Sequence, residues 1–186
     1  MSLILGAVCD DGVVLAADSK TIFNDTKAVS YKIKKIHKVG SVAFGIAGLG
    51  YYDRAIEVLK KSINDWLIFN PSIHLEVITD ELCTKAEKFL IDETANFHIL
   101  LANSDCLYSI QAHMDEDRYV RYAKHRIEKS AIAGIEDVQL IPYLGARTTQ
   151  QLGSHLAQII RLNKGPTVGG RTQIVPLPKH VKLHSL

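Results

Sequence analysis

The chain has 186 residues, of which 47% are hydrophobic and 23% charged, and this balance predicts one globular domain spanning residues 1–186. Its formal net charge of +2 is too small to favour a nucleic acid or an anionic membrane surface as a partner. We expect no membrane-spanning helix, because no apolar run reaches about eighteen residues, and no signal peptide, which together favour a cytoplasmic location.

Two short apolar runs near the N-terminus, Leu3–Val8 and Val13–Ala17, are joined by Asp10-Asp11-Gly12. An Asp-Gly pair between two β-prone runs is a strong short-range signal for a β-hairpin. Ser2 stands directly before the first run, and Asp18 stands directly after the second. The hairpin therefore places a serine and an aspartate at the same end of a predicted sheet.

Removal of Met1 would leave Ser2 with a free α-amine beside its own hydroxyl group. This arrangement activates a weak nucleophile, because the amine accepts the proton of the hydroxyl group. The alternative is that Ser2 is an ordinary N-terminal serine and that Asp18 merely ends a strand. These residues alone leave both interpretations open.

A second hairpin is predicted from the alternating segment Lys32–Val39 and the apolar segment Val42–Ala47, which Gly48 follows. Only one of Lys34 and Lys35 is expected to point inward, since adjacent residues of a strand face opposite sides. An inward lysine needs a compensating partner, and Asp18 is the candidate. The turn at Gly48 leaves main-chain N–H groups that suit an anionic transition state, or it is simply a tight turn.

The rest of the chain predicts helices and strands from periods of about 3.6 and 2 residues. The predicted helices cover Tyr52–Leu67, Leu75–Asp92 and Gln150–Leu162, and the predicted strands cover Phe97–Ala102, Cys106–Ala112, Tyr119–Tyr122, Lys129–Ala133 and Thr172–Leu177.

Histidine and cysteine residues give no sign of a metal site. The eight histidines form no His-x-His or His-Glu-x-x-His arrangement, and the three cysteines lack paired ligand spacing. The acidic run Asp115–Asp117 lacks the alternating ligands and central glycine of a calcium loop. We therefore predict no metal and no cofactor, with reduced thiols in a reducing compartment.

The segments LGAVCDDGVVLAADSK (residues 5–20) and IKKIHKVGSVAFGIAGLG (residues 33–50) resemble the opening of proteasome β-type subunits, which are N-terminal-nucleophile hydrolases. The resemblance implies an α+β fold, a four-layer α/β/β/α sandwich of two antiparallel sheets. It also implies four catalytic positions: Ser2 as the nucleophile, Asp18 and Lys35 as its supporting ion pair, and Gly48 as an oxyanion donor.

The sequence departs from the family pattern at three places. The Gly-Ser-Gly of the family corresponds to Ala133-Gly134-Ile135, which has no serine. The aspartate and serine that precede a Gly-Gly pair in active members are missing before Gly169-Gly170, where Thr167 alone carries a hydroxyl group. The residue after Met1 is serine, where threonine is usual.

The resemblance implies a peptidase that acts on peptides or unfolded proteins from a homo-oligomeric ring or double ring, with any ATPase partner unidentified. The principal alternative is a non-catalytic, ring-forming subunit of the same fold. A third possibility is another N-terminal-nucleophile chemistry, such as amide transfer. Non-catalytic α-type subunits carry an extra helix before the first strand, and the sequence shows no such segment, which favours a β-type relative.

Overall fold

The computed structural model describes residues 2–22, 26, 28–48, 52–70, 74–90, 97–117, 119–135, 138–139 and 147–179. Its helices are α1 (Tyr52–Phe69), α2 (Leu75–Leu90) and α3 (Thr149–Leu162). Its strands are β1 (Leu3–Cys9), β2 (Gly12–Ala17), β3 (Thr21–Ile22), β4 (Val29–Ser30), β5 (Ile36–Val39), β6 (Val42–Ala47), β7 (Phe97–Ala102), β8 (Leu107–Met114), β9 (Val120–Ile127), β10 (Ser130–Gly134) and β11 (Gln173–Pro178).

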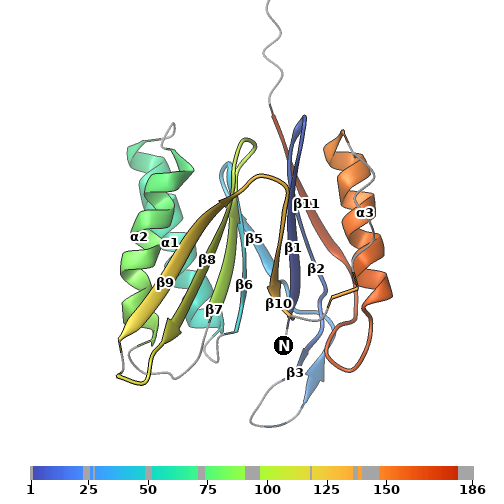
Figure 1. Ribbon diagram of the computed structural model, residues 1–186, viewed down its shortest axis with the longest axis horizontal. Helices are drawn as coiled ribbons and strands as arrows, with labels where there is room; N and C mark the ends of the chain where they lie inside the picture. The colour runs from blue at the N-terminus through green and yellow to red at the C-terminus, as the bar shows by residue number, and fades with distance from the viewer. Residues whose placement is uncertain are drawn as a thin grey trace, which may run out of the picture.

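The elements form four layers (Figure 1). Helices α1 and α2 cover a five-stranded sheet of order β5-β6-β7-β8-β9, which packs on a four-stranded sheet of order β10-β1-β2-β11, and α3 covers the far face of the second sheet. The paired strands that the structure describes run antiparallel. The predicted four-layer α/β/β/α sandwich is therefore confirmed.

Strands β1 and β2 lie in the middle of the molecule and are buried on both faces. Ile4 and Leu15 pack into the core between the two sheets, whereas Leu3 and Leu5 pack against α3. A strand covered on both sides needs apolar residues at successive positions, which explains why the first hairpin reads as two continuous apolar runs. The site described below lies where these two strands meet the N-terminus.

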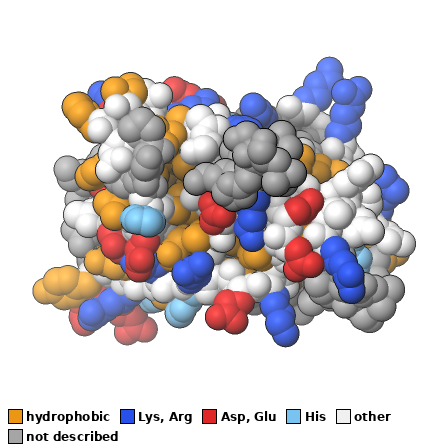
Figure 2. Space-filling model, turned by 90° about the horizontal axis from the view of Figure 1, so that it is seen from above, with side chains coloured by type: hydrophobic (Ala, Val, Ile, Leu, Met, Phe, Trp, Pro, Cys, Tyr) orange, Lys and Arg blue, Asp and Glu red, His pale blue; other side chains and the backbone are white. Residues whose placement is uncertain are grey.

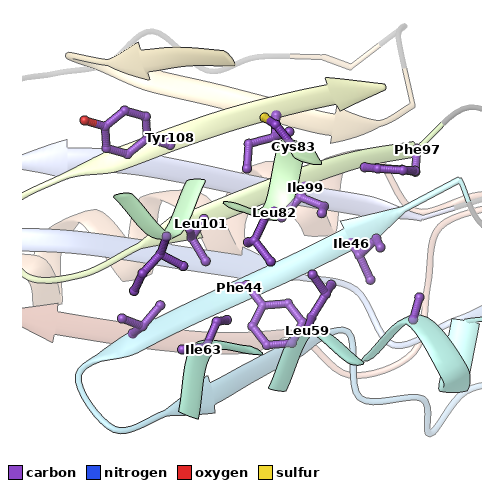
Figure 3. Close-up of a cluster of buried hydrophobic side chains, with 14 of the residues drawn as sticks. Phe44, Ile46, Leu59, Ile63, Leu82, Cys83, Phe97, Ile99, Leu101 and Tyr108 are labelled. Carbon is purple, nitrogen blue, oxygen red and sulfur yellow. The ribbon is translucent and has the colours of Figure 1, made fainter. Parts of the chain in front are cut away.

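A third core lies between the five-stranded sheet and helices α1 and α2 (Figure 3). Phe44 and Ile99 of the sheet face Leu59, Ile63 and other apolar residues of the helices, and each of these side chains is buried. The helical period of about 3.6 residues predicted these apolar faces directly. Of the predicted second helix, residues 91 and 92 lie outside the described residues.

The second hairpin begins later than predicted. The alternating pattern predicted a strand over Lys32–Val39, whereas β5 begins at Ile36. The main-chain N–H groups of Lys35 and Ile36 donate to side-chain Oε1 of Gln173, at 2.9 and 3.3 Å. A contact with a residue so distant in the sequence leaves no local signal, and the period-2 pattern therefore extended the strand too far.

Two later strands also differ from prediction. Strand β9 continues to Ile127 rather than ending at Tyr122. It is an edge strand with many exposed, charged residues, and because such a composition is also typical of loops, the sequence pattern ended the strand too early. The segment predicted as Lys129–Ala133 forms β10, which belongs to the four-stranded sheet. Strand β10 pairs with β1 there, with Gly134 opposite Leu3. This pairing brings Gly134 to the start of the chain.

Charged side chains of both signs are interspersed on the face seen in Figure 2, in keeping with the small net charge. Among the helices of the described residues, none has the length and apolar character needed to cross a membrane.

Candidate active site

Asp18 follows the last residue of β2, and its side chain is fully buried. Its Oδ1 accepts hydrogen bonds from the Leu3 N–H group at 3.0 Å and from Lys35 Nζ at 2.7 Å. Its Oδ2 accepts from the main-chain N–H groups of Lys20, at 3.0 Å, and Gly169, at 3.1 Å. Donors from four separate positions therefore fix the carboxylate and hold it next to the first strand.

Lys35 is the inward lysine, with a side chain that is 1% exposed, whereas Lys34 is exposed. Burial lowers the pKa of Lys35 from its ordinary value, because the charged ammonium loses contact with water, and Asp18 acts in the opposite direction. The predicted contact between Lys35 and Asp18 is thus present. Its catalytic role is a prediction.

Ser2 is half-buried and precedes the residue that Asp18 holds. Lys35 Nζ and the Leu3 nitrogen both donate to the same oxygen atom of Asp18. The distance between the two nitrogen atoms therefore cannot exceed the sum of these two hydrogen-bond lengths. The Asp18 N–H group also donates to the Leu3 carbonyl oxygen at 3.2 Å. The Lys35 ammonium is therefore a close neighbour of the peptide group that joins Ser2 to Leu3.

Gly134 lies between Ser2 and the end of β6. A Cβ atom on Gly134 would lie 1.8 Å from the Ser2 carbonyl oxygen and 3.3 Å from Cβ of Ala47. Gly48 comes directly after Ala47, is exposed and has a φ of +98°, which is typical of glycine in a turn. The structure thus gathers Ser2, Asp18, Lys35 and the segment that carries Gly48 at one end of the two sheets. The oxyanion role of Gly48 is a prediction.

The change Gly134→Ala tests this close packing. Alanine disfavours the φ of +104° at Gly134, and its methyl group would overlap the Ser2 carbonyl oxygen. We expect the free energy of unfolding in urea to fall by at least about 2 kcal/mol. Gly165→Ala is the matched control, since a Cβ atom there meets nothing within 4 Å, and it is expected to stay within about 0.5 kcal/mol of the parent. Equal losses in the two variants would contradict the arrangement.

The turn around Gly169 and Gly170 supports the site, and the sequence pattern alone did not show how. Ser19 N–H donates to the Gly169 carbonyl oxygen, and Ser19 Oγ accepts from the Arg171 N–H group at 2.8 Å and donates to the Tyr31 carbonyl oxygen at 2.6 Å. Gly170 has a φ of +75°, and a Cβ atom there would lie 2.4 Å from Ser19 Oγ. Glycine at position 170 is thus required by a turn that closes on the residues after β2.

In the part of the chain that the structure describes, no three histidine, cysteine or acidic side chains are grouped so that they could hold a metal ion.

A known family model matches the first half of the chain. The model of the family described as proteasome subunit matches residues 2–97, a little more than half of the chain. No curated protein matches the chain significantly. The matched range contains Ser2, Asp18, Lys35 and Gly48, and the observed sandwich is the fold that the resemblance implied. The chain belongs to the proteasome subunit family.

Proposed function

We propose that the protein is an N-terminal-nucleophile peptidase whose nucleophile is Ser2 after removal of Met1. The Ser2 hydroxyl attacks the carbonyl carbon of a peptide bond while its proton moves to the α-amine, which acts as general base. The Gly48 N–H group stabilises the resulting oxyanion. The protonated amine then gives its proton to the departing amine of the substrate, leaving an acyl ester on Ser2. Water hydrolyses this ester, with the amine again as base.

Lys35 supports this reaction through its charge. A positive charge beside the α-amine lowers the amine's pKa, so that a larger fraction is unprotonated and able to accept the hydroxyl proton. Asp18 compensates the charge of Lys35 and fixes the orientation of the Lys35 side chain. The mechanism needs no metal or cofactor.

The observation that carries the proposal is the buried pair of Lys35 and Asp18 next to the first strand. Removing two charges from water costs several kcal/mol per ion in typical proteins, and apolar residues of similar size often serve stability better. A buried ion pair that touches the peptide group after Ser2 is therefore better explained by chemistry than by stability.

A second candidate function is a non-catalytic subunit with the same fold. The turn at Gly169 favours this alternative. The turn contributes a main-chain N–H group to Asp18, and the residues before it are Gly165, Pro166, Thr167 and Val168. These residues replace the aspartate and serine of active members.

We also propose that the domain, spanning residues 1–186, assembles into a closed homo-oligomeric ring or double ring in the cytoplasm, with Ser2 facing an inner chamber. Closed rings require a contact that repeats around an axis, and the family match supports such assembly. Analytical ultracentrifugation tests it: sedimentation only near the chain mass of 20.6 kDa would refute the ring.

The peptidase proposal is tested on the purified protein by intact mass and by hydrolysis of short fluorogenic peptides. We expect the mass of the chain without Met1, together with hydrolysis and a transient acyl adduct on Ser2. Free carboxylic acid as the product distinguishes hydrolysis from amide transfer. A chain without Met1 that cleaves none of a broad peptide set, yet forms the ring, would favour the non-catalytic subunit.

A further inference from the structure

The side-chain amide of Gln173, the first residue of β11, holds the main chain on both sides of Lys34. Its Oε1 accepts from the N–H groups of Lys35 and Ile36, and its Nε2 donates to the Ile33 carbonyl oxygen at 2.6 Å. Gln173 stands opposite Ala17 in the pairing of β11 with β2, and Ala17 directly precedes Asp18. Asp18 and the residue that binds the Lys35 segment therefore lie at the same end of the neighbouring strands β2 and β11.

Regular strand geometry would send Lys35 in the wrong direction. Ile36 packs into the core between the sheets, and His37 stacks on Phe44 on the face covered by α1 and α2. Because side chains alternate along a strand, a continued β5 would turn Lys35 toward the helices, on the same side as His37. Lys35 instead reaches Asp18 in the other sheet. The chain thus has to depart from regular strand geometry just before Ile36. At this point the Gln173 side-chain amide, in place of a neighbouring strand, hydrogen-bonds the main chain.

We propose that Gln173 is a positioning residue that turns Lys35 toward Asp18 by binding the main chain of residues 33–36. Its importance for catalysis rests on the proposed function, whereas its effect on Lys35 can be measured without any activity. The hydrogen bonds of the Gln173 side chain go to the main chain of Ile33, Lys35 and Ile36, so its proposed effect on Ser2 acts through Lys35.

The decisive variants are Gln173→Met and Gln173→Glu. Methionine keeps an unbranched side chain of similar size but removes every hydrogen bond of the amide. Glutamate keeps an oxygen that accepts from Lys35 and Ile36, but its second carboxylate oxygen would face the Ile33 carbonyl oxygen, to which the amide now donates, and repel it. Gln158→Met is the control, since Gln158 is exposed on α3. All variants are studied as the full chain without Met1.

Hydrogen exchange and lysine acetylation with a succinimidyl ester are the direct measurements. In the parent, the Lys35 and Ile36 amides should exchange slowly, and Lys35 should react far more slowly than exposed Lys34. Gln173→Met should raise these exchange rates and the Lys35 acetylation rate about tenfold. Gln173→Glu, which keeps the acceptor but opposes the Ile33 carbonyl oxygen, should fall between Gln173→Met and the parent, and Gln158→Met should keep the parent values. Rapid exchange of both amides in the parent, or protection of Lys35 in Gln173→Met, would overturn the proposal. The parent measurement decides even where a variant fails to fold.

The pH profile of the Ser2 α-amine is a second measurement of where Lys35 lies. Asp18 and Lys35 are the charged pair bound next to the Leu3 N–H group, and the neighbouring Lys20 directs its Nζ to the Gly165 carbonyl oxygen. If Lys35 moves away, the pKa of the Ser2 α-amine rises toward its ordinary value, and the acetylation of that amine shifts to higher pH. An unshifted profile in Gln173→Met would count against the proposal.

Activity is a separate arm of the test. Gln173→Met is expected to lower kcat for peptide hydrolysis more than it changes KM, because Lys35 does not contact the ground-state substrate in the proposed mechanism. If neither the parent nor any variant hydrolyses peptides, the proposed function fails. The exchange and acetylation results then still decide whether Gln173 positions Lys35.

Discussion

Replacing Ser2 with alanine is expected to lower kcat/KM for peptide hydrolysis by at least about a thousandfold. Alanine keeps the α-amine and the main chain that Asp18 holds through Leu3, but it lacks the oxygen that forms the acyl ester. Loss of a nucleophile removes the covalent route entirely, and the remaining activity comes only from binding and oxyanion stabilisation. Fluorogenic peptides measure the effect over the full pH range of the parent.

Ser2→Thr is the matched control for this loss. Threonine retains a hydroxyl group next to the α-amine, and serine, threonine and alanine are all small enough to allow removal of Met1. We expect Ser2→Thr to keep hydrolysis within about tenfold of the parent, and Ser2→Ala to unfold within about 0.5 kcal/mol of it. Parent-like hydrolysis by Ser2→Ala would reject Ser2 as the nucleophile, whatever the state of the ion pair.

The first hairpin and the three helices were predictable because their signals are local. An Asp-Gly turn between apolar runs predicted β1 and β2 to within a residue at each end. Helical periodicity predicted α1, α2 and α3 because each helix buries one face against a sheet. Burial that follows a fixed period can be read from any short window of the chain.

The choice of Lys35 over Lys34 shows the limit of such local reasoning. Alternation along the strand identifies one inward lysine, but with Ile36 in the core between the sheets it would have selected Lys34. The family resemblance selected Lys35, and the structure agrees because Gln173 interrupts the strand. The correct residue therefore could not be derived from periodicity alone.

The supporting residues of the site were not predictable for a related reason. Gly134, Gly169 and Gln173 contact Ser2, Asp18 and the Lys35 segment across more than 130 residues of sequence. Gly134 and Gly169 read locally as ordinary turn residues, and Gln173 reads as one polar position in a strand. Sheet pairing gives them their role, since β10 and β11 flank the first hairpin on either side.

Asp18→Ala is expected to be the most destabilising of the substitutions considered. It leaves the Lys35 ammonium buried without its carboxylate and removes the acceptor of three main-chain N–H groups. Breaking a buried pair by removing one partner typically costs about 3–5 kcal/mol. Urea unfolding at one fixed protein concentration measures the loss, because ring assembly would make stability depend on concentration. Glu57→Ala is the control, since it breaks the exposed pair with Lys60 and should cost less than about 1 kcal/mol.

The double variant Asp18→Ala, Lys35→Met identifies the cause of that loss. If the uncompensated charge dominates, removing it should restore a large part of the stability, and the two substitutions will be strongly non-additive. Raising the pH should also increase the stability of the single variant Asp18→Ala, because it removes the charge of Lys35. Burial lowers the pKa of Lys35 in the folded state, so between that pKa and the ordinary 10.5 the unfolded chain binds more protons, and stability increases with pH. The double variant lacks this group and should show a flatter profile. Additive losses with parallel pH profiles would mean that lost hydrogen bonds, and not the buried charge, explain why Asp18 is needed.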